Sequence, residues 1–200
     1  MRSPVLMSRT DTGLLVIDVQ TKLMDKIGER DRIVANIARL AVGAKILDMA
    51  VQATEQYPKG IGPTVPELAD RLPPRPEKLS FSCCGLPQVA EQFRQRGVHK
   101  VLLAGIETHV CVQQTALDLL AQGIRVYVAA DAVGSRKQTD RELALRRMEQ
   151  AGVVLTTTEA ALFEWTEVAG TPEFKQISRL VTTPDQQLLN DSMPNEPSSG

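Results

Sequence analysis

Cysteine is scarce in this chain of 200 residues, and its three copies are poorly placed for a disulfide framework. Cys83 and Cys84 are adjacent, and an odd number leaves at least one thiol unpaired. No apolar stretch reaches membrane-spanning length, and the N-terminal residues lack the apolar centre of a secretory signal. We therefore expect a cytoplasmic protein with reduced thiols and no membrane partner.

An excess of charge of one sign is also missing, and aromatic residues are few. The chain has 23 Lys and Arg against 24 Asp and Glu, mixed along its length, and only 4% aromatic residues. Proteins that hold nucleic acid use basic surfaces and stacking aromatic rings. Nucleic acid is therefore not expected as the main partner.

What the chain does contain is a regular alternation of two apolar patterns, within a length and a hydrophobic content typical of one globular domain. Strand-like runs are expected at residues 13–17, 50–54, 78–81, 100–104, 125–129 and 152–155. Helical patterns are expected at residues 33–47, 87–96, 109–122 and 140–150, the last with Thr139 and Glu142 as a capping box. Such alternation predicts an α/β fold with a six-stranded parallel sheet covered on both faces.

Two segments break this alternation. Residues 57–76 carry eight Pro and Gly residues, which predicts a long loop with at most one helical turn. Residues 183–200 are rich in polar residues and proline, and a disordered tail is expected there. The predicted domain therefore covers residues 1–182.

Residues that follow strands are the first candidates for chemistry, because ligands of parallel sheets bind at the carboxyl ends of the strands. Asp18 follows the first run, Lys78 opens the third, and Cys111 lies where the fourth run leads into a helix. A helix start and a nearby ammonium would lower the pKa of a thiol and give a thiolate nucleophile. A carboxylate could then accept and return protons. Each residue also has a plain structural reading, as a small buried thiol, a turn residue or a solvated charge.

Three segments together, residues 15–20, 78–82 and 104–112, resemble the isochorismatase-like cysteine hydrolases, and the resemblance extends over about residues 10–180. Residues 54–58 and the run that follows are most similar to the isochorismatase domain-containing subgroup. The resemblance implies a three-layer αβα sandwich with strand order 3-2-1-4-5-6. It also implies a catalytic triad of Asp18, Lys78 and Cys111.

The resemblance implies, in addition, a cis peptide bond between Ile106 and Glu107, with the backbone amides of Glu107 and Cys111 as the oxyanion hole. Nicotinamidases of this family have histidine metal ligands between the first two triad residues, whereas this chain has no histidine between Gln20 and Lys78. We therefore expect no metal and no other cofactor. Isochorismatase proper lacks the cysteine, so its presence here favours covalent acyl chemistry.

The predicted function is hydrolysis of a small amide-type (C–N) substrate through a thioester on the cysteine, by a homo-oligomer. Four residues beside the motifs are candidates for lining the substrate pocket: Gln20, Tyr57, Phe81 and Val110. His109 is given no general-base role, and Asp131 is expected to anchor a loop. Two alternatives stay open, which are a catalytically weak oligomeric binding or regulatory protein of this fold and an RNA-associated or nuclease role. A redox role for Cys83 or Cys84 also stays open.

Overall fold

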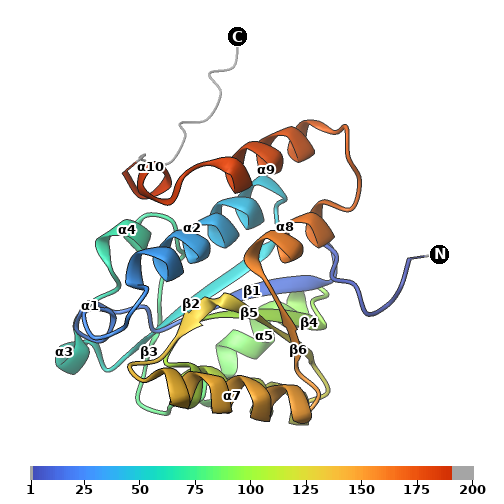
Figure 1. The fold of residues 1–200 in the computed structure, drawn as a ribbon. Coiled ribbons are helices and arrows are strands. Elements are labelled where there is room, and N and C mark those ends of the chain that lie inside the picture. Colours follow the sequence, from blue (N-terminus) through green and yellow to red (C-terminus); the bar gives the residue numbers. More distant parts are fainter. Residues whose placement is uncertain (1, 191–200) are drawn as a thin grey trace.

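The computed structural model describes residues 2–190, and a twisted parallel sheet lies at its centre (Figure 1). Its six strands are β1 (Thr12–Ile17), β2 (Ala50–Gln56), β3 (Glu77–Lys78), β4 (Lys100–Ile106), β5 (Arg125–Gly134) and β6 (Val154–Thr156). They are arranged in the order β3-β2-β1-β4-β5-β6, and all pairs are parallel. The predicted α/β class and the strand order 3-2-1-4-5-6 are confirmed.

Helices cover both faces of the sheet (Figure 1). One layer consists of α2 (Arg30–Ile46), α8 (Thr158–Thr166), α9 (Pro172–Thr182) and α10 (Asp185–Asn190). The other consists of α5 (Pro87–Gln95), α6 (Gln113–Ala121) and α7 (Gln138–Gln150). Shorter elements are α1 (Thr21–Met24), α3 (Pro58–Ile61), α4 (Pro66–Ala69), the 3₁₀ turn η1 (Cys83–Gly85) and the π-helical turn η2 (Thr108–Val112).

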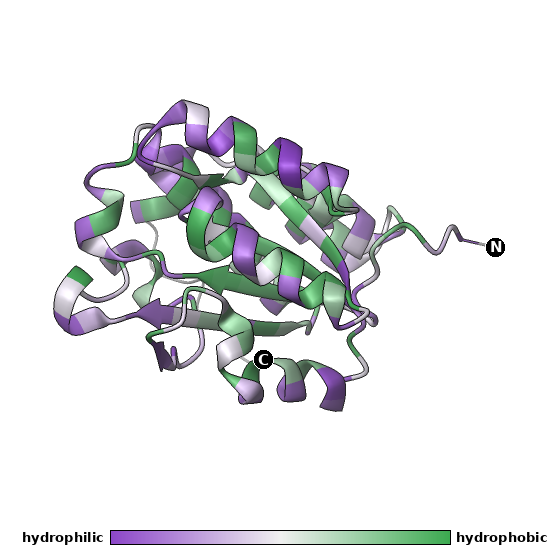
Figure 2. Ribbon diagram, turned by 90° about the horizontal axis from the view of Figure 1, so that it is seen from below, coloured by the Kyte–Doolittle hydropathy of each residue, from purple (hydrophilic) through white to green (hydrophobic). Residues whose placement is uncertain are grey.

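The central strand explains the two cores. In β1, Leu14 and Val16 pack in the core under α2, while Leu15 and Ile17 pack in the core under α5 and α6. Successive side chains of a strand point to opposite faces, so a strand covered on both sides reads as a continuous apolar run. Figure 2 shows the strands as predominantly hydrophobic, whereas the helices alternate between hydrophobic and hydrophilic residues.

Several predicted boundaries are wrong. The third strand ends at Lys78 instead of continuing to residue 81, because the chain turns there and the carbonyls of Ser80 and Phe81 bind the Lys78 ammonium. The loop of residues 57–76 contains two short helices, α3 and α4, each with proline at a first position where the missing N–H costs nothing.

The capping-box prediction is also wrong. Helix α7 begins at Gln138, and the side chain at its N-cap, Lys137, makes no capping hydrogen bond. Glu142 instead accepts a hydrogen bond from the side chain of Gln138, 2.9 Å away on the same helix. The helix therefore starts earlier than Thr139 would have set it.

The expected disordered tail is wrong for residues 183–190. Helix α10 packs on α2, with the Leu188 side chain buried in the core and Asp185 in an ion pair with Arg39 at 2.7 Å. Arg39 and Arg71 also donate hydrogen bonds to the carbonyls of Thr183 and Leu188, so apolar packing and two arginines hold this polar segment. Residues 191–200 lie outside the described residues. Within the described chain, no helix is long and apolar enough to cross a bilayer.

Candidate functional site

The site is built around Asp18, which directly follows β1. Asp18 has a left-handed backbone (φ 53°) and a fully buried side chain. Aspartate tolerates this conformation better than most residues, and the turn aims the carboxylate away from the strand direction. Asp18 Oδ2 accepts a hydrogen bond from Lys78 Nζ at 2.6 Å, and Oδ1 accepts one from Thr54 Oγ1 at 2.8 Å. Both carboxylate oxygens therefore have short, fixed partners.

Lys78 has only acceptors around its ammonium. Besides Asp18, Nζ lies 2.7 Å from Gln56 Oε1, 2.9 Å from the Phe81 carbonyl and 3.2 Å from the Ser80 carbonyl. The Lys78 side chain has no exposed surface. A buried charge is tolerable when it is paired and hydrogen-bonded in this way.

Cys111 lies in the turn η2 at the carboxyl end of β4, and only 6% of the residue is exposed. Burial raises the pKa of the Cys111 thiol, and the Asp18 carboxylate facing it raises it further, both as a charge and as a hydrogen-bond acceptor. Lys78 acts in the opposite direction but does not compensate. The expected lowering of the Cys111 pKa is therefore not found, because burial and the Asp18 charge act against it. The three predicted residues nevertheless come together.

The turn that carries Cys111 depends on close approach of two strands. Gly105 has φ of 119°, and a Cβ added to it would lie 2.1 Å from the backbone oxygen of Ile17. The next peptide bond but one, between Ile106 and Glu107, is cis, as the family resemblance implied. The Glu107 carbonyl then accepts hydrogen bonds from the amides of Val110 and Val112 at the start of η2.

The Glu107 side chain links this turn to Arg136 through hydrogen bonds. Its carboxylate accepts hydrogen bonds from Arg136 Nε at 2.8 Å, Nη2 at 3.2 Å and the Arg136 amide at 3.2 Å. Although burial acts to raise it, these contacts hold the pKa of the Glu107 carboxyl below its ordinary value. His109 Nδ1 lies 3.0 Å from Ser135 Oγ, so it packs on the same side.

The four predicted pocket residues differ in how far their side chains are exposed. Gln20 is completely buried, and its amide bonds the backbone of Gln56 and Gly62, so it joins loop segments and has no surface for a substrate. Val110 is partly buried against the core under α6. Tyr57 and Phe81 are each 52% exposed and flank the Lys78 segment. These two remain candidates for the entrance to the site.

Sequence reasoning missed two residues of the buried site, Thr54 and Gln56, and considered Cys83 only for a redox role. Thr54 and Gln56 lie at the carboxyl end of β2, next to Asp18, and the rule that selected Asp18 would have selected them too. Cys83 is fully buried with its Sγ 3.5 Å from Thr54 Oγ1. No local pattern distinguishes it from Cys84.

Two further observations concern metal binding and the role of Asp131. Within residues 2–190, no group of three or more His, Cys, Asp or Glu side chains is arranged to hold a metal ion. Asp131 accepts two hydrogen bonds from Thr158, through its amide at 2.8 Å and its hydroxyl at 3.0 Å. Asp131 therefore anchors the start of α8.

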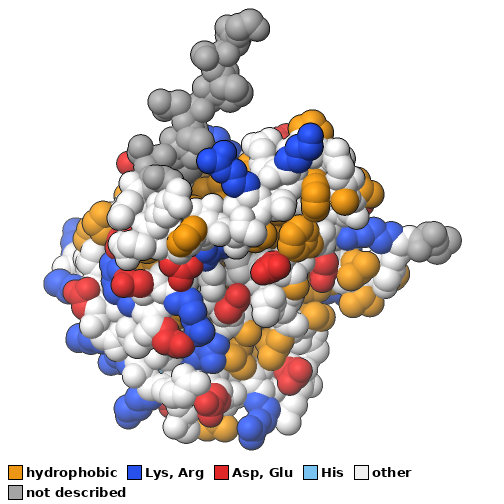
Figure 3. Space-filling model, turned by 45° about the horizontal axis from the view of Figure 1, so that its top comes forward, with side chains coloured by type: hydrophobic (Ala, Val, Ile, Leu, Met, Phe, Trp, Pro, Cys, Tyr) orange, Lys and Arg blue, Asp and Glu red, His pale blue; other side chains and the backbone are white. Residues whose placement is uncertain are grey.

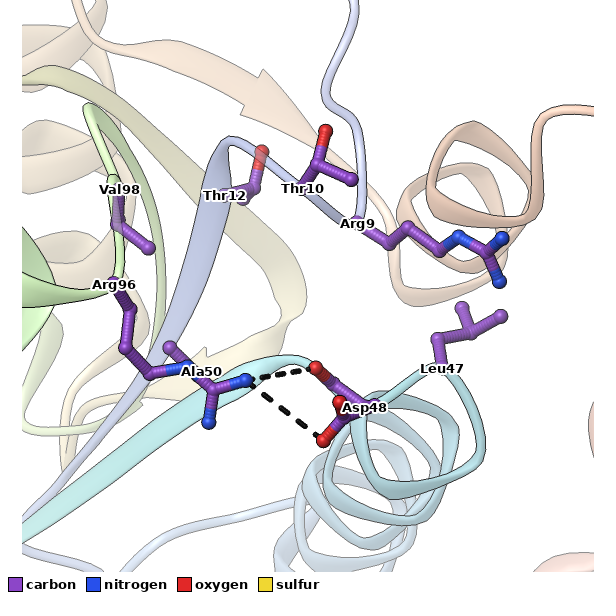
Figure 4. Close-up of a pocket in the computed structure, with 8 residues that line it drawn as sticks. All are labelled: Arg9, Thr10, Thr12, Leu47, Asp48, Ala50, Arg96 and Val98. Atoms are coloured by element: carbon purple, nitrogen blue, oxygen red, sulfur yellow. Dashed lines mark hydrogen bonds and ion pairs between the residues drawn. The ribbon is translucent and has the colours of Figure 1, made fainter.

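A separate hollow lies at the opposite edge of the sheet, beside the starts of β1 and β2 (Figure 4). Arg96 there binds Asp48, with Nη2 3.0 Å from the Asp48 carbonyl, and Arg9 points away from both (Figure 4). The hollow contains none of the three cysteines among its lining residues. The hollow therefore does not include the candidate nucleophile Cys111.

Known proteins match this chain over most of its length. The model of the isochorismatase domain matches residues 12–160. Isochorismatase domain-containing protein 2 of Danio rerio is 43% identical over 187 residues, which cover 92% of this chain and 94% of the relative.

Two solved structures extend the comparison. A Caenorhabditis elegans protein described as the MAR1 ribonuclease superimposes with a TM-score of 0.85 and 38% identity, covering 98% of this chain and all of that one. The YcaC gene product of Escherichia coli, described as an octameric hydrolase of unknown specificity, gives a TM-score of 0.82 at 24% identity and covers 94% and 97% of the two chains.

Proposed function

Because this chain belongs to the isochorismatase family, we propose that it is a cysteine hydrolase that cleaves a small amide-type (C–N) substrate through a thioester on Cys111. The observation that carries the proposal is the buried pair of Asp18 and Lys78, with Oδ2 and Nζ 2.6 Å apart, beside the Cys111 thiol, whose pKa both charges shift. A nucleophile, a base and a fixed cation therefore share one buried site.

The raised pKa of Cys111 determines the order of events. The thiol keeps its proton at rest, so Asp18 accepts that proton while sulfur attacks the carbonyl carbon. The backbone amides of Glu107 and Cys111 hold the resulting oxyanion. Asp18 returns the proton to the leaving nitrogen as the C–N bond breaks and the thioester forms. Asp18 then takes a proton from water, whose oxygen attacks the thioester. As the C–S bond breaks, the acid product leaves and Asp18 returns the proton to the Cys111 sulfur, which regenerates the thiol.

Lys78 takes no part in bond making in this mechanism. Its ammonium is surrounded by four acceptors and fixes the position of the Asp18 carboxylate, 2.6 Å away. The Lys78 charge also offsets the thiolate as it develops. Lys78 is therefore the electrostatic partner of both other groups.

The test uses p-nitrophenyl acetate, an activated ester that reports acylation without knowledge of the natural substrate, followed by a panel of small primary carboxamides. Wild-type protein should release p-nitrophenol and carry one acetyl group on the peptide that contains Cys111. Cys111→Ala should abolish both, whereas Cys84→Ala, which changes a half-buried cysteine outside the site, should keep both. Acetylation that persists in Cys111→Ala would contradict the proposal and leave a binding or regulatory protein as the better reading.

A second candidate function comes from the relatives. The C. elegans protein is described as a ribonuclease, so RNA cleavage is the alternative to test. The net charge of −1 and the interspersed acidic and basic side chains on the face in Figure 3 argue against a phosphate-binding surface. Cleavage of a labelled single-stranded RNA by wild type but not by Cys111→Ala would establish the alternative.

Self-association completes the proposal. The E. coli relative is described as octameric. Three exposed apolar side chains lie beside Lys78 in the chain and its contacts, and we call them the rim. They are Leu79, with 78% exposure, and the half-exposed Tyr57 and Phe81. Burying such side chains against another subunit is favourable. We therefore propose a homo-oligomer with the rim at its contact.

A further inference from the structure

The buried site contains a second thiol that the hydrolytic steps leave unused. Cys83 has no exposed surface, and its backbone amide donates to Thr115 Oγ1 at 2.9 Å, which ties the turn η1 to α6. Burial first, and then the Asp18 charge, raise the pKa of the Cys83 thiol to about 11. Cys83 is therefore a neutral thiol near pH 7, with one hydrogen to donate.

Thr54 stands between this thiol and the carboxylate. Its hydroxyl oxygen lies 2.8 Å from Asp18 Oδ1 and 3.5 Å from Cys83 Sγ. A hydroxyl has one hydrogen, and an ionised carboxylate can only accept. The Thr54 hydrogen therefore points to Asp18, and the lone pairs that remain on the oxygen face Cys83. The thiol must be the donor in the second contact.

We infer that Thr54 and Cys83 form a positioning relay, in which the Cys83 thiol donates to the Thr54 hydroxyl and that hydroxyl donates to Asp18. The inference rests on the proposed function, because it assigns the relay to the base of that reaction. The titratable groups that face Asp18 are Lys78 from β3, Cys111 from η2 and Cys83 from η1. Thr54 from β2 also contacts Asp18, and its hydroxyl does not titrate.

The relay has a mechanical and an electrostatic consequence. With Oδ2 held by Lys78 and Oδ1 held by Thr54, the carboxylate cannot rotate away from the Cys111 thiol. Hydrogen bonds to a carboxylate favour its charged form, and a donor behind the hydroxyl strengthens that bond by polarisation. Thr54 and Cys83 are thus positioning residues, since neither touches the substrate.

Infrared spectroscopy tests the relay without any reaction. The S–H stretching band of Cys83 is assigned by its loss in Cys83→Ala, in a Cys84→Ala background. Thr54→Val keeps the shape of the side chain and removes the hydroxyl, so this band should move to higher frequency. Thr54→Ser should leave the band near its wild-type position. A band that stays in place in Thr54→Val would overturn the relay.

Acylation by p-nitrophenyl acetate tests the role of the relay in the proposed reaction. Thr54→Val should lower the acylation rate about 10-fold, the usual effect of losing a hydrogen bond to a charged group, and should move the acid limb of the pH–rate profile to higher pH. Thr54→Ser should restore the wild-type profile, and Cys83→Ala should move the acid limb in the same direction as Thr54→Val. Thermal unfolding checks that each variant is folded.

The outcomes separate the two proposals. A wild-type pH profile in Thr54→Val, with Cys111→Ala inactive, would overturn the relay and leave the hydrolase standing. Absence of acylation in the wild type would remove the hydrolase, and the positioning role with it, while the infrared band would still decide whether the hydrogen-bonded chain exists.

Discussion

Asp18 and Lys78 form an ion pair without exposed surface, and the two side chains depend on one another. Lys78→Ala should lower the free energy of unfolding by about 3–5 kcal/mol, because it leaves a buried carboxylate without its partner. The double variant Asp18→Asn/Lys78→Met should be more stable than Lys78→Ala, since it removes both charges. Urea denaturation measures both. Equal stability of the single and double variants would mean that lost packing, and not the unpaired charge, is the cause.

The buried thiols should make stability depend on alkaline pH. Unfolded cysteine has an ordinary pKa of 9.0, whereas burial raises the pKa of Cys83 to about 11 and raises that of Cys111 as well. Above pH 9 the unfolded chain has released protons that the folded chain retains, so the free energy of unfolding falls as pH rises. Below pH 8 this contribution is fully present.

The two-unit difference at Cys83 corresponds to a loss of up to about 3 kcal/mol by pH 11. Urea denaturation of the wild type at pH 7.5 and pH 10 should show the decline, and Cys83→Ala should show a smaller one. Cys84→Ala is the matched control, because Cys84 is only half buried. The same pH dependence in wild type and Cys83→Ala would contradict the assignment of the decline to this thiol.

The junction of β1 and β4 is the element on which the site depends most. Gly105 has a positive φ, and no side chain fits there because the Ile17 backbone lies within 2.1 Å of its Cβ position. Gly105→Ala should therefore destabilise the protein by more than about 4 kcal/mol or prevent folding. Thermal unfolding and the yield of soluble protein measure the effect.

Gly28 provides the control for this junction. A Cβ at Gly28 would meet nothing within 4 Å, so Gly28→Ala should change stability by less than about 1 kcal/mol. A fully stable Gly105→Ala protein would mean that the two strands can separate without loss, and the turn with Cys111 would then need another source of rigidity.

At the scale of the whole molecule, the rim should control assembly. Light scattering after size exclusion should give a mass above that of one 21.9 kDa chain. Leu79→Asp should shift the distribution toward the monomer, because it places a charge where an apolar contact is expected. Val168→Asp changes another exposed apolar residue elsewhere, with 61% exposure, and should not shift the distribution. A wild-type monomer at micromolar concentration would contradict the proposal.

The sequence pattern predicted the layers, and the family resemblance implied the strand order and the triad of Asp18, Lys78 and Cys111. Apolar runs with the period of strands and helices are local properties, and they predict the sheet of β1 to β6 without knowledge of contacts. Asp18, Lys78 and Cys111 could be selected because each lies at a strand end or within a motif. The element ends were less predictable, since α10 depends on Leu188 reaching the core and on Arg39, far away in the chain.

Only the tertiary structure decided the direction in which the Cys111 pKa shifts and brought Thr54 and Cys83 to the site. The Cys111 thiol was expected to be ionised on the basis of its helix start and a lysine, but desolvation and the facing carboxylate outweigh both. Thr54 of β2 meets Asp18, and Cys83 of η1 meets Thr54, only in the folded chain. The reason is physical: the free energy of a charge depends on its distance from other charges and from water, and folding sets both distances between residues that the sequence keeps far apart.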